Sequence, residues 1–219
     1  MVAICPTNNE IWIFEANNQE DISKWTKVAV LKEHFNVISS LDWHPKTNLL
    51  MSASTDRGVI IWAPGATKGE FSPQIGMIKE QRANLDAVWN TRGDIFAVAT
   101  SSGDVHIGTY SSQNNFWVAH PFNAKKSIHK ASVLCVRFDP LSGRVVASSS
   151  LDGTVVITSC YKSDQEYDSA GPFGKITSYG VTLYSISNNG WVNSLTFSPN
   201  SATLSYVTHD CEVNFFNLS

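Results

Sequence analysis

The chain has 219 residues, of which 42% are hydrophobic and 11% aromatic, so it has enough apolar side chains for a packed core and too many to be disordered. A formal net charge of −3 and an isoelectric point of about 6.0 exclude a strongly basic surface of the kind that binds nucleic acid. No apolar run approaches the roughly 18 residues that a membrane helix needs, so we expect no membrane span.

The chain begins with residues that read as three short strands, at 2–5, 10–15 and 25–31. Each run is rich in β-branched and aromatic residues, and a Pro-Thr-Asn-Asn turn at residues 6–9 separates the first two. In a four-stranded unit these would be the second, third and outermost strands. We therefore expect the sequence to open in the middle of such a unit.

The next stretch has the clearest pattern in the chain. Alternating residues at 37–43, a buried run at 49–54 and a third run at 59–62 predict three strands joined by hairpins. The turns between them, at residues 44–48 and 55–58, are rich in Pro, Asn, Asp and Gly.

Four polar or aromatic residues punctuate this stretch in a fixed order: His34, Ser52, Asp56 and Trp62. The order resembles the hydrogen-bonding set of a WD repeat, in which Asp accepts from the His ring, the ring meets the Ser hydroxyl, and the Trp N–H meets the same hydroxyl. Leaving any one of these buried groups without a hydrogen-bond partner would cost roughly 1–3 kcal/mol of folding free energy. We expect a structural role, although a His–Ser–Asp trio also invites comparison with hydrolases.

The pattern recurs along the chain. Aromatic anchors end four equivalent runs at intervals of about 50 residues, at Trp43, Trp89, Phe138 and Phe197. The turn before the third strand of each unit also recurs, and it carries Asp56, Ser102, Asp152 and Asp210 in successive units. The unit around Trp89 has lost the polar set, since Gly108 takes the place of Trp62 and no His precedes its first strand. It must rely on apolar packing.

The fourth unit restores part of the set. His129, Ser148 and Asp152 are present, and Thr158 stands where Trp would be. In the fifth unit Asp210 is the remaining member. The spacing and the four-strand rhythm predict an all-β fold, a WD-repeat β-propeller with about four and a half blades. The predicted blades are residues 1–31, 32–80, 81–121, 122–187 and 188–219, the first and last of them partial.

The four cysteines are Cys5, Cys135, Cys160 and Cys211, and no two form a CxxC pair. We therefore expect reduced, packed thiols rather than zinc ligands. The six histidines also lack metal-ligand spacing. No GxGxxG, GxxxxGK[ST] or GxSxG motif occurs. The sequence predicts no metal, no cofactor and no catalytic residue.

Several segments outside the generic repeat are specific enough to indicate a family. They are ICP with NNE and IFE (4–15), KWTKV (24–28), LKEH (31–34), TDR (55–57), NNFWV (114–118), PFG (172–174) and GWV (190–192). Together they resemble the WD-repeat subunit, subunit 1, of the actin-related protein 2/3 complex, and the resemblance runs nearly end to end. That family is a longer, seven-bladed propeller.

The resemblance implies a non-catalytic scaffold subunit that supports nucleation of branched actin filaments, in the cytoplasm and at the actin cytoskeleton. Its partners would be the other subunits of the complex and nucleation-promoting activators. The family's helical insert toward the mother filament falls outside this sequence, so any contact with the actin filament would be indirect. We expect the chain to be a fragment or partial product of a longer protein, with pairing of two open arrays as the alternative.

Candidate partner contacts are exposed residues that the repeat does not need. They are Trp25 and Lys27 on an outer strand, Arg57 beside Asp56, and a basic cluster that could meet an acidic tail, formed by Lys125, Lys126 and Lys130. The alternative function is a generic WD-repeat adaptor, such as a ubiquitin-ligase receptor or a coat subunit. Such an adaptor would share the blade rhythm but not the family segments.

Overall fold

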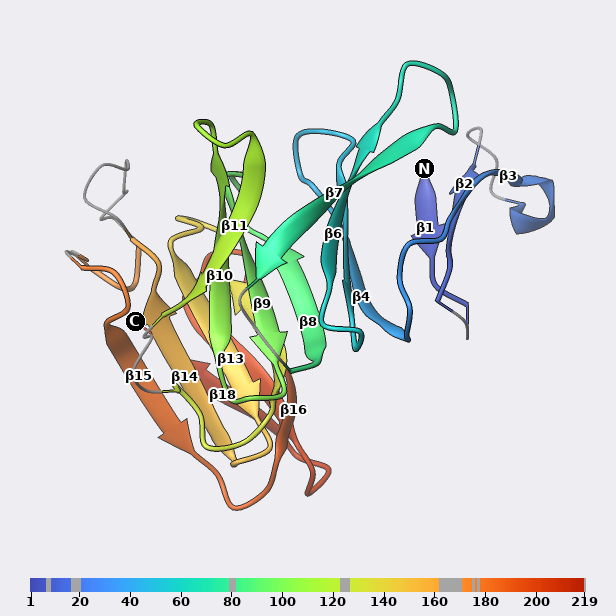
Figure 1. Cartoon of the computed structure of the whole chain (residues 1–219). Helices are drawn as coiled ribbons and strands as arrows, with labels where there is room; N and C mark the ends of the chain where they lie inside the picture. Colours follow the sequence, from blue (N-terminus) through green and yellow to red (C-terminus); the bar gives the residue numbers. More distant parts are fainter. Residues whose placement is uncertain are drawn as a thin grey trace.

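A computed structural model describes residues 1–6, 9–16, 21–78, 82–122, 127–161, 171–174, 176 and 178–218. Within these residues the chain forms eighteen β-strands and one short 3₁₀ helix, η1 (Ile22–Lys24). Figure 1 shows the strands following one another across the molecule, from the blue first sheet on one side to the orange β15 on the other.

The strands fall into five successive units, in each of which neighbours in sequence pair antiparallel. Unit one contains β1 (Val2–Ile4), β2 (Ile11–Glu15) and β3 (Thr26–Leu31). Unit two contains β4 (Ile38–Trp43), β5 (Leu50–Ser54), β6 (Val59–Pro64) and β7 (Phe71–Ile78). Unit three contains β8 (Asn84–Trp89), β9 (Ile95–Thr100), β10 (Val105–Ser111) and β11 (Phe116–Pro121). Unit four contains β12 (Val133–Phe138), β13 (Val145–Ser150), β14 (Thr154–Ser159) and β15 (Thr182–Ser187). Unit five contains β16 (Val192–Phe197), β17 (Thr203–Thr208) and β18 (Val213–Asn217).

The second strand of each middle unit is buried on both faces. All residues of β5, β9 and β13 are buried, and their sequences LMSAS, IFAVAT and VVASSS mix apolar residues with small Ala and Ser. Small residues suit a strand that lies between two other sheets, because both faces must allow close approach. The first strands share a further feature: β4, β8, β12 and β16 each have a register shift just after their first residue.

The core consists of four apolar clusters, one between each pair of successive units. The first joins Ile11 and Ile13 of unit one to Leu50 and Trp62 of unit two. Equivalent clusters join units two and three, three and four, and four and five. Sheets stacked face to face in chain order, each burying its neighbour, form an incomplete β-propeller.

Units two and three are joined by an additional strand pairing that the sequence does not predict. The end of β7 pairs in parallel with β11, with Met77 opposite Val118 and Ile78 opposite Ala119, which makes one eight-stranded sheet. Figure 1 shows the arrowhead of β7 beside β11. The sequence predicts the outer strand near 74–79, whereas β7 begins at Phe71 and is long enough to leave its own unit. The pairing satisfies backbone groups that two edge strands would otherwise present to solvent.

Unit three packs around aromatic side chains in place of the polar set. A Cβ built on Gly108 would lie 2.0 Å from the Phe96 ring, so this ring fills the space that a larger residue would need. The Trp89 ring lies edge-on to both Phe96 and Trp117, with centroid separations of 5.4 and 5.0 Å. The apolar packing expected for this unit is thus present.

Candidate interaction surface

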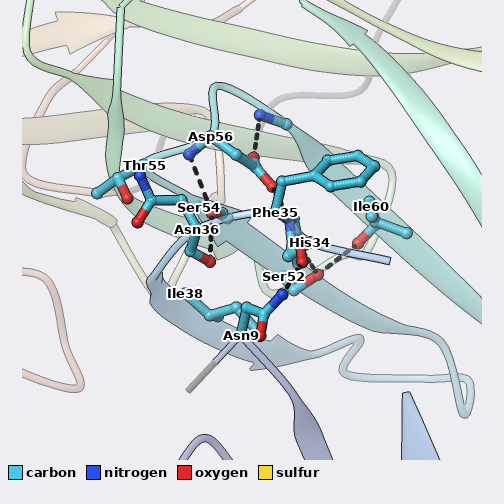
Figure 2. A network of polar contacts seen from close by, with 12 residues as sticks. Asn9, His34, Phe35, Asn36, Ile38, Ser52, Ser54, Thr55, Asp56 and Ile60 are labelled. Atoms are coloured by element: carbon cyan, nitrogen blue, oxygen red, sulfur yellow. Dashed lines mark hydrogen bonds and ion pairs between the residues drawn. The ribbon is translucent and has the colours of Figure 1, made fainter. Parts of the chain in front are cut away.

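The polar set of unit two is a continuous chain of hydrogen bonds at one end of the sheet. His34 Nδ1 lies 2.8 Å from Asp56 Oδ2, and His34 Nε2 lies 2.8 Å from Ser52 Oγ. The Trp62 indole N–H donates to the same Ser52 oxygen at 2.9 Å. His34, Ser52 and Trp62 are buried. Figure 2 shows His34, Ser52 and Asp56 of this network, where the loop before β4 meets the β5–β6 turn.

Asp56 also holds the two loops of unit two together. Its carboxylate accepts the backbone N–H of Phe35 at 2.9 Å and that of Gly58 at 2.7 Å. Partial burial alone would raise the pKa of Asp56, but these two N–H groups and the His34 ring outweigh it and hold the pKa below its usual value. The carboxylate therefore stays ionised and fixes the loop that leads into β4, called the leading loop below.

Unit four uses the same residue types with a different connection. His129 Nε2 lies 2.7 Å from Ser148 Oγ, as in unit two, but His129 Nδ1 meets Thr154 Oγ1 at 2.8 Å. Asp152 is 3.6 Å from the ring and instead accepts from the Thr154 hydroxyl at 2.6 Å. The threonine thus relays the contact. Thr154 is not among the residues that the sequence predicts for this set.

The residue that stands where Trp would be differs as well. Thr158 is buried, and its hydroxyl has no hydrogen-bond partner among the described residues. It therefore fills the position without making the bond that Trp62 makes in unit two.

Asp210 does not fit the expectation of a buried set in unit five. Asp210 is exposed. In this unit the Tyr206 hydroxyl instead donates to Asn188 Oδ1 at 3.1 Å. Asn188 stands where His34 and His129 stand in their units, counted from the aromatic anchor. Without a histidine ring at that place, a carboxylate in the turn has nothing buried to bind.

Hydrogen bonds also join successive units at this same end. The Asn84 amide donates to the Gly58 carbonyl at 3.1 Å, the His129 N–H to Gly103 at 3.0 Å, and the Asn188 N–H to Gly153 at 2.8 Å. Asn84 is the first residue of β8, and His129 and Asn188 lie in the loops that lead into β12 and β16; each of the three bonds ends on the turn between the second and third strands of the unit before. The leading loops and these turns therefore form one connected surface.

The inner strands β4, β8 and β12 carry a charged cluster that the sequence reading missed. Arg137 Nη1 lies 2.5 Å from Asp86 Oδ2, which also accepts the Val136 N–H at 3.1 Å. Asp42 Oδ2 accepts the backbone N–H of Trp89 at 2.7 Å. These residues line a cavity of about 330 Å³. No pattern within a single strand identifies this cluster, because its charged side chains come from three different strands.

Asp42 is the carboxylate least suited to its surroundings. Burial raises its pKa above the usual value, and the nearby charge of Asp86 adds to the effect. The Trp89 N–H and the Arg137 charge act in the opposite direction without cancelling it.

The candidate partner contacts lie on separate parts of the surface. Trp25 is half-buried just after η1, and exposed Lys27 places its ammonium 4.1 Å from the centre of the Trp12 ring. Arg57 and Lys130 are exposed on the surface formed by the turns and leading loops, and the Lys130 N–H donates to Asp152 at 2.7 Å. Lys125 and Lys126 lie outside the described residues.

Two further features of the described chain bear on function. No three His, Cys, Asp or Glu side chains among the described residues come together as metal ligands would. The described part of the chain also contains no helix with the length and apolar character to cross a membrane.

Comparison with known proteins identifies both the repeat and its relatives. The WD domain, G-beta repeat model matches residues 25–63 and 123–159. Actin-related protein 2/3 complex subunit 1A of Arabidopsis thaliana is 29% identical over 98% of this chain and 55% of its own length. Subunit 1A-B of Xenopus laevis is 27% identical over 100% of this chain and 57% of its own. Subunit 1 of Schizosaccharomyces pombe is 22% identical over 94% and 52%.

The chain spans about half the length of these curated relatives, although they cover nearly all of it. The likeness reaches from the first unit to the fifth, well beyond the two matched repeats. The chain thus contains two segments that match the WD repeat and is similar, over nearly all of its length, to subunit 1 of the actin-related protein 2/3 complex.

Proposed function

We propose that this chain acts as a non-catalytic scaffold subunit of the actin-related protein 2/3 complex and supports nucleation of branched actin filaments. The observation that carries the proposal is the end-to-end similarity to curated proteins named as subunit 1 of that complex, in a plant, a frog and a yeast. No feature favours a ubiquitin-ligase receptor or a coat subunit.

The chemistry of the polar sets supports a structural role rather than a catalytic one. A nucleophilic serine needs an accessible hydroxyl next to its base. Ser52 is completely buried and accepts the Trp62 N–H, and Ser148 is buried beneath His129. Neither hydroxyl could reach a substrate without opening the sheet.

We further propose where the scaffold meets its partners. The partners are the other subunits of the complex and nucleation-promoting activators, with the actin filament reached indirectly, in the cytoplasm at the actin cytoskeleton. The contact residues are Trp25, Lys27, Arg57 and the cluster of Lys125, Lys126 and Lys130. We also propose that the blades comprise residues 1–31, 32–80, 81–121, 122–187 and 188–219, the first and last of them partial.

The proposal is tested by purifying the tagged chain from extracts of its own cells and identifying the co-purifying proteins by mass spectrometry. We expect two actin-related proteins together with the small subunits of the complex. A matched control is Phe96→Asp, which places a charge in the core between units two and three and should abolish specific recovery. Recovery of a cullin adaptor or coat subunits from the folded chain would support the alternative adaptor function instead. Recovery of chaperones alone would count against assembly.

A further inference from the structure

Unit two carries an exposed apolar pair beside a cation. Phe35 is 92% exposed and Val37 is 55% exposed, both on the leading loop. Arg57 is exposed at the tip of the β5–β6 turn. The Phe35 N–H bonds to Asp56, and the Thr55 N–H donates to the Val37 carbonyl at 3.0 Å, so the loop and the turn form one surface. We call Phe35, Val37 and Arg57 the Phe35 surface; Figure 2 shows Phe35 beside Thr55 and Asp56 of the turn.

Hydrogen bonds from the underlying residues of unit two hold the backbone of this surface in place. The Ser54 hydroxyl donates to the Val37 carbonyl at 2.9 Å, and the Asp56 N–H donates to the Ser54 hydroxyl at 3.1 Å. His34, next to Phe35, is fixed by the buried network. A partner that binds a fixed backbone loses little free energy in ordering it. The aromatic ring is therefore presented in a pre-organised position, as interface anchors are.

Arg57 adopts a backbone conformation that its side chain disfavours. Its φ is +78°, in the left-handed region that a non-glycine residue adopts only with backbone strain. The equivalent turn positions of units three and four are Gly103 and Gly153, with φ of +93° and +79°. A glycine would thus serve the fold at this position without strain.

The Arg57 side chain makes no polar contact with the residues that the structure describes. No hydrogen bond or ion pair joins its guanidinium to another residue in the part of the chain that the structure describes, including the exposed acid Glu33 on the leading loop. The local surface therefore offers positive charge beside two apolar side chains.

We infer that the Phe35 surface docks a partner segment that places a carboxylate on Arg57 and an apolar side chain against Phe35 and Val37. A guanidinium binds a carboxylate through two parallel N–H bonds, which gives both energy and orientation. An exposed ring next to that pair gives the partner's apolar side chain a surface to cover. This inference rests on the proposed scaffold function and assigns to it one docking surface and the chemistry of its occupant.

The test uses a photo-reactive residue in the full chain, expressed in its own cells. Phe35→benzoylphenylalanine is irradiated in the extract, and the cross-linked peptide is mapped by mass spectrometry. We expect one partner segment with Asp or Glu close to an apolar residue. The same probe at Leu141, which is 55% exposed in the β12–β13 turn at the opposite end of its unit, is the control for non-specific cross-linking.

Neutral substitution of Arg57 separates docking from folding. Arg57→Gly and Arg57→Asn both tolerate the left-handed conformation, so thermal unfolding should match or exceed that of the parent. We expect the cross-link yield from position 35 to fall about tenfold, as expected for loss of a charge-assisted contact. Arg57→Glu should abolish the cross-link, and changing the mapped carboxylate to Lys should restore it.

Three results would overturn the inference: no cross-link above the Leu141 control, a mapped segment without a carboxylate, or unchanged yield in the folded Arg57→Gly protein. Co-purification of actin-related proteins is scored in the same samples. Retained co-purification with an unchanged yield would reject the docking surface but leave the scaffold function standing. A charge-reversal rescue without those proteins would retain the surface and reject the scaffold function.

Discussion

The turn aspartate of the repeat has a different environment in each of three units. Asp56 binds its histidine directly, Asp152 binds through Thr154, and Asp210 is exposed. The neighbouring residues explain the difference. In unit four the Thr154 hydroxyl comes between carboxylate and ring, and unit five has Asn188 in place of the ring. The free energy that an aspartate contributes should therefore follow its contacts rather than its place in the motif.

Asp56→Ala tests this at the position with the most contacts. The substitution leaves the His34 ring and two backbone N–H groups without their acceptor, so we expect a loss of roughly 1–3 kcal/mol in the free energy of unfolding. Urea denaturation followed by tryptophan fluorescence measures it. Asp210→Ala, at the exposed equivalent, should change the free energy by less than about 0.5 kcal/mol. Equal losses in the two variants would contradict the assignment.

Asp42→Asn tests a carboxylate whose environment opposes its charge. Because burial and Asp86 raise the pKa of Asp42 in the folded state, ionisation of Asp42 weakens folding as the pH rises through its range. The asparagine amide oxygen can still accept the Trp89 N–H. We expect the variant to have a higher urea midpoint than the parent at neutral pH. The difference should disappear below about pH 3, where an aspartate is protonated in both states. A lower midpoint at neutral pH would show that attraction to Arg137 dominates instead.

At the scale of one element, β10 shows how an apolar unit replaces the polar set. Gly108 lets the Phe96 ring lie against the backbone of β10, where unit two has Trp62 bonded to Ser52. The ring is fully buried and packed against Trp89 and Trp117. It therefore has little room to move away from an added atom.

Gly108→Ala should consequently destabilise the protein by roughly 1–3 kcal/mol through overpacking. Thermal unfolding measures the loss. Gly171→Ala is the matched control, since a Cβ there would meet nothing within 4 Å. In the background of Phe96→Leu, the added methyl group should cost less than it does in the parent, because the smaller side chain leaves space. If the cost is unchanged in that background, Phe96 is not the source of the strain.

The strands themselves could be predicted from the sequence because their pattern is local. The run at 84–89 matches β8, and the hairpin turns at Asp56 and Asp152 follow from residue type alone. The pairing of β7 with β11 could not be predicted, because it joins two edge strands that are distant in sequence. The Thr154 relay and the Asp86–Arg137 pair were missed for a related reason. Each depends on how side chains from separate strands meet, which residue type and spacing do not define.

At the scale of the whole molecule, stability lies between units rather than within them. Each apolar cluster is shared by two successive units, so no sheet buries its faces alone. Two charged contacts also cross from one unit to the next: Asp94 of unit three accepts from Arg144 of unit four at 2.6 Å, and Asp86 of unit three pairs with Arg137 of unit four. Loss of one interface should therefore weaken its neighbours, as in other repeat arrays.

The titratable groups of these units predict how the molecule responds to acid. Burial lowers the pKa of His129, so the folded state holds the neutral ring. As the pH falls through about 6.5, the unfolded chain binds a proton that the folded chain does not, and stability decreases. The pKa values of Asp56, Asp94 and Asp152 are below normal, because the hydrogen bonds they accept outweigh burial. Their contribution is full above about pH 4 and is lost as the pH falls through their folded values.

We therefore expect stability to decline in two stages, and His129→Gln isolates the first. The variant should be less stable than the parent at pH 7, because it loses the ring contacts with Ser148 and Thr154. Its free energy of unfolding should change less between pH 7 and pH 5.5 than that of the parent, because glutamine binds no proton when the chain unfolds. Urea denaturation across this range measures both slopes. If the free energy of unfolding of the variant changes with pH as steeply as that of the parent, a group other than His129 causes the first decline. Only the decline caused by the carboxylates would then be assigned.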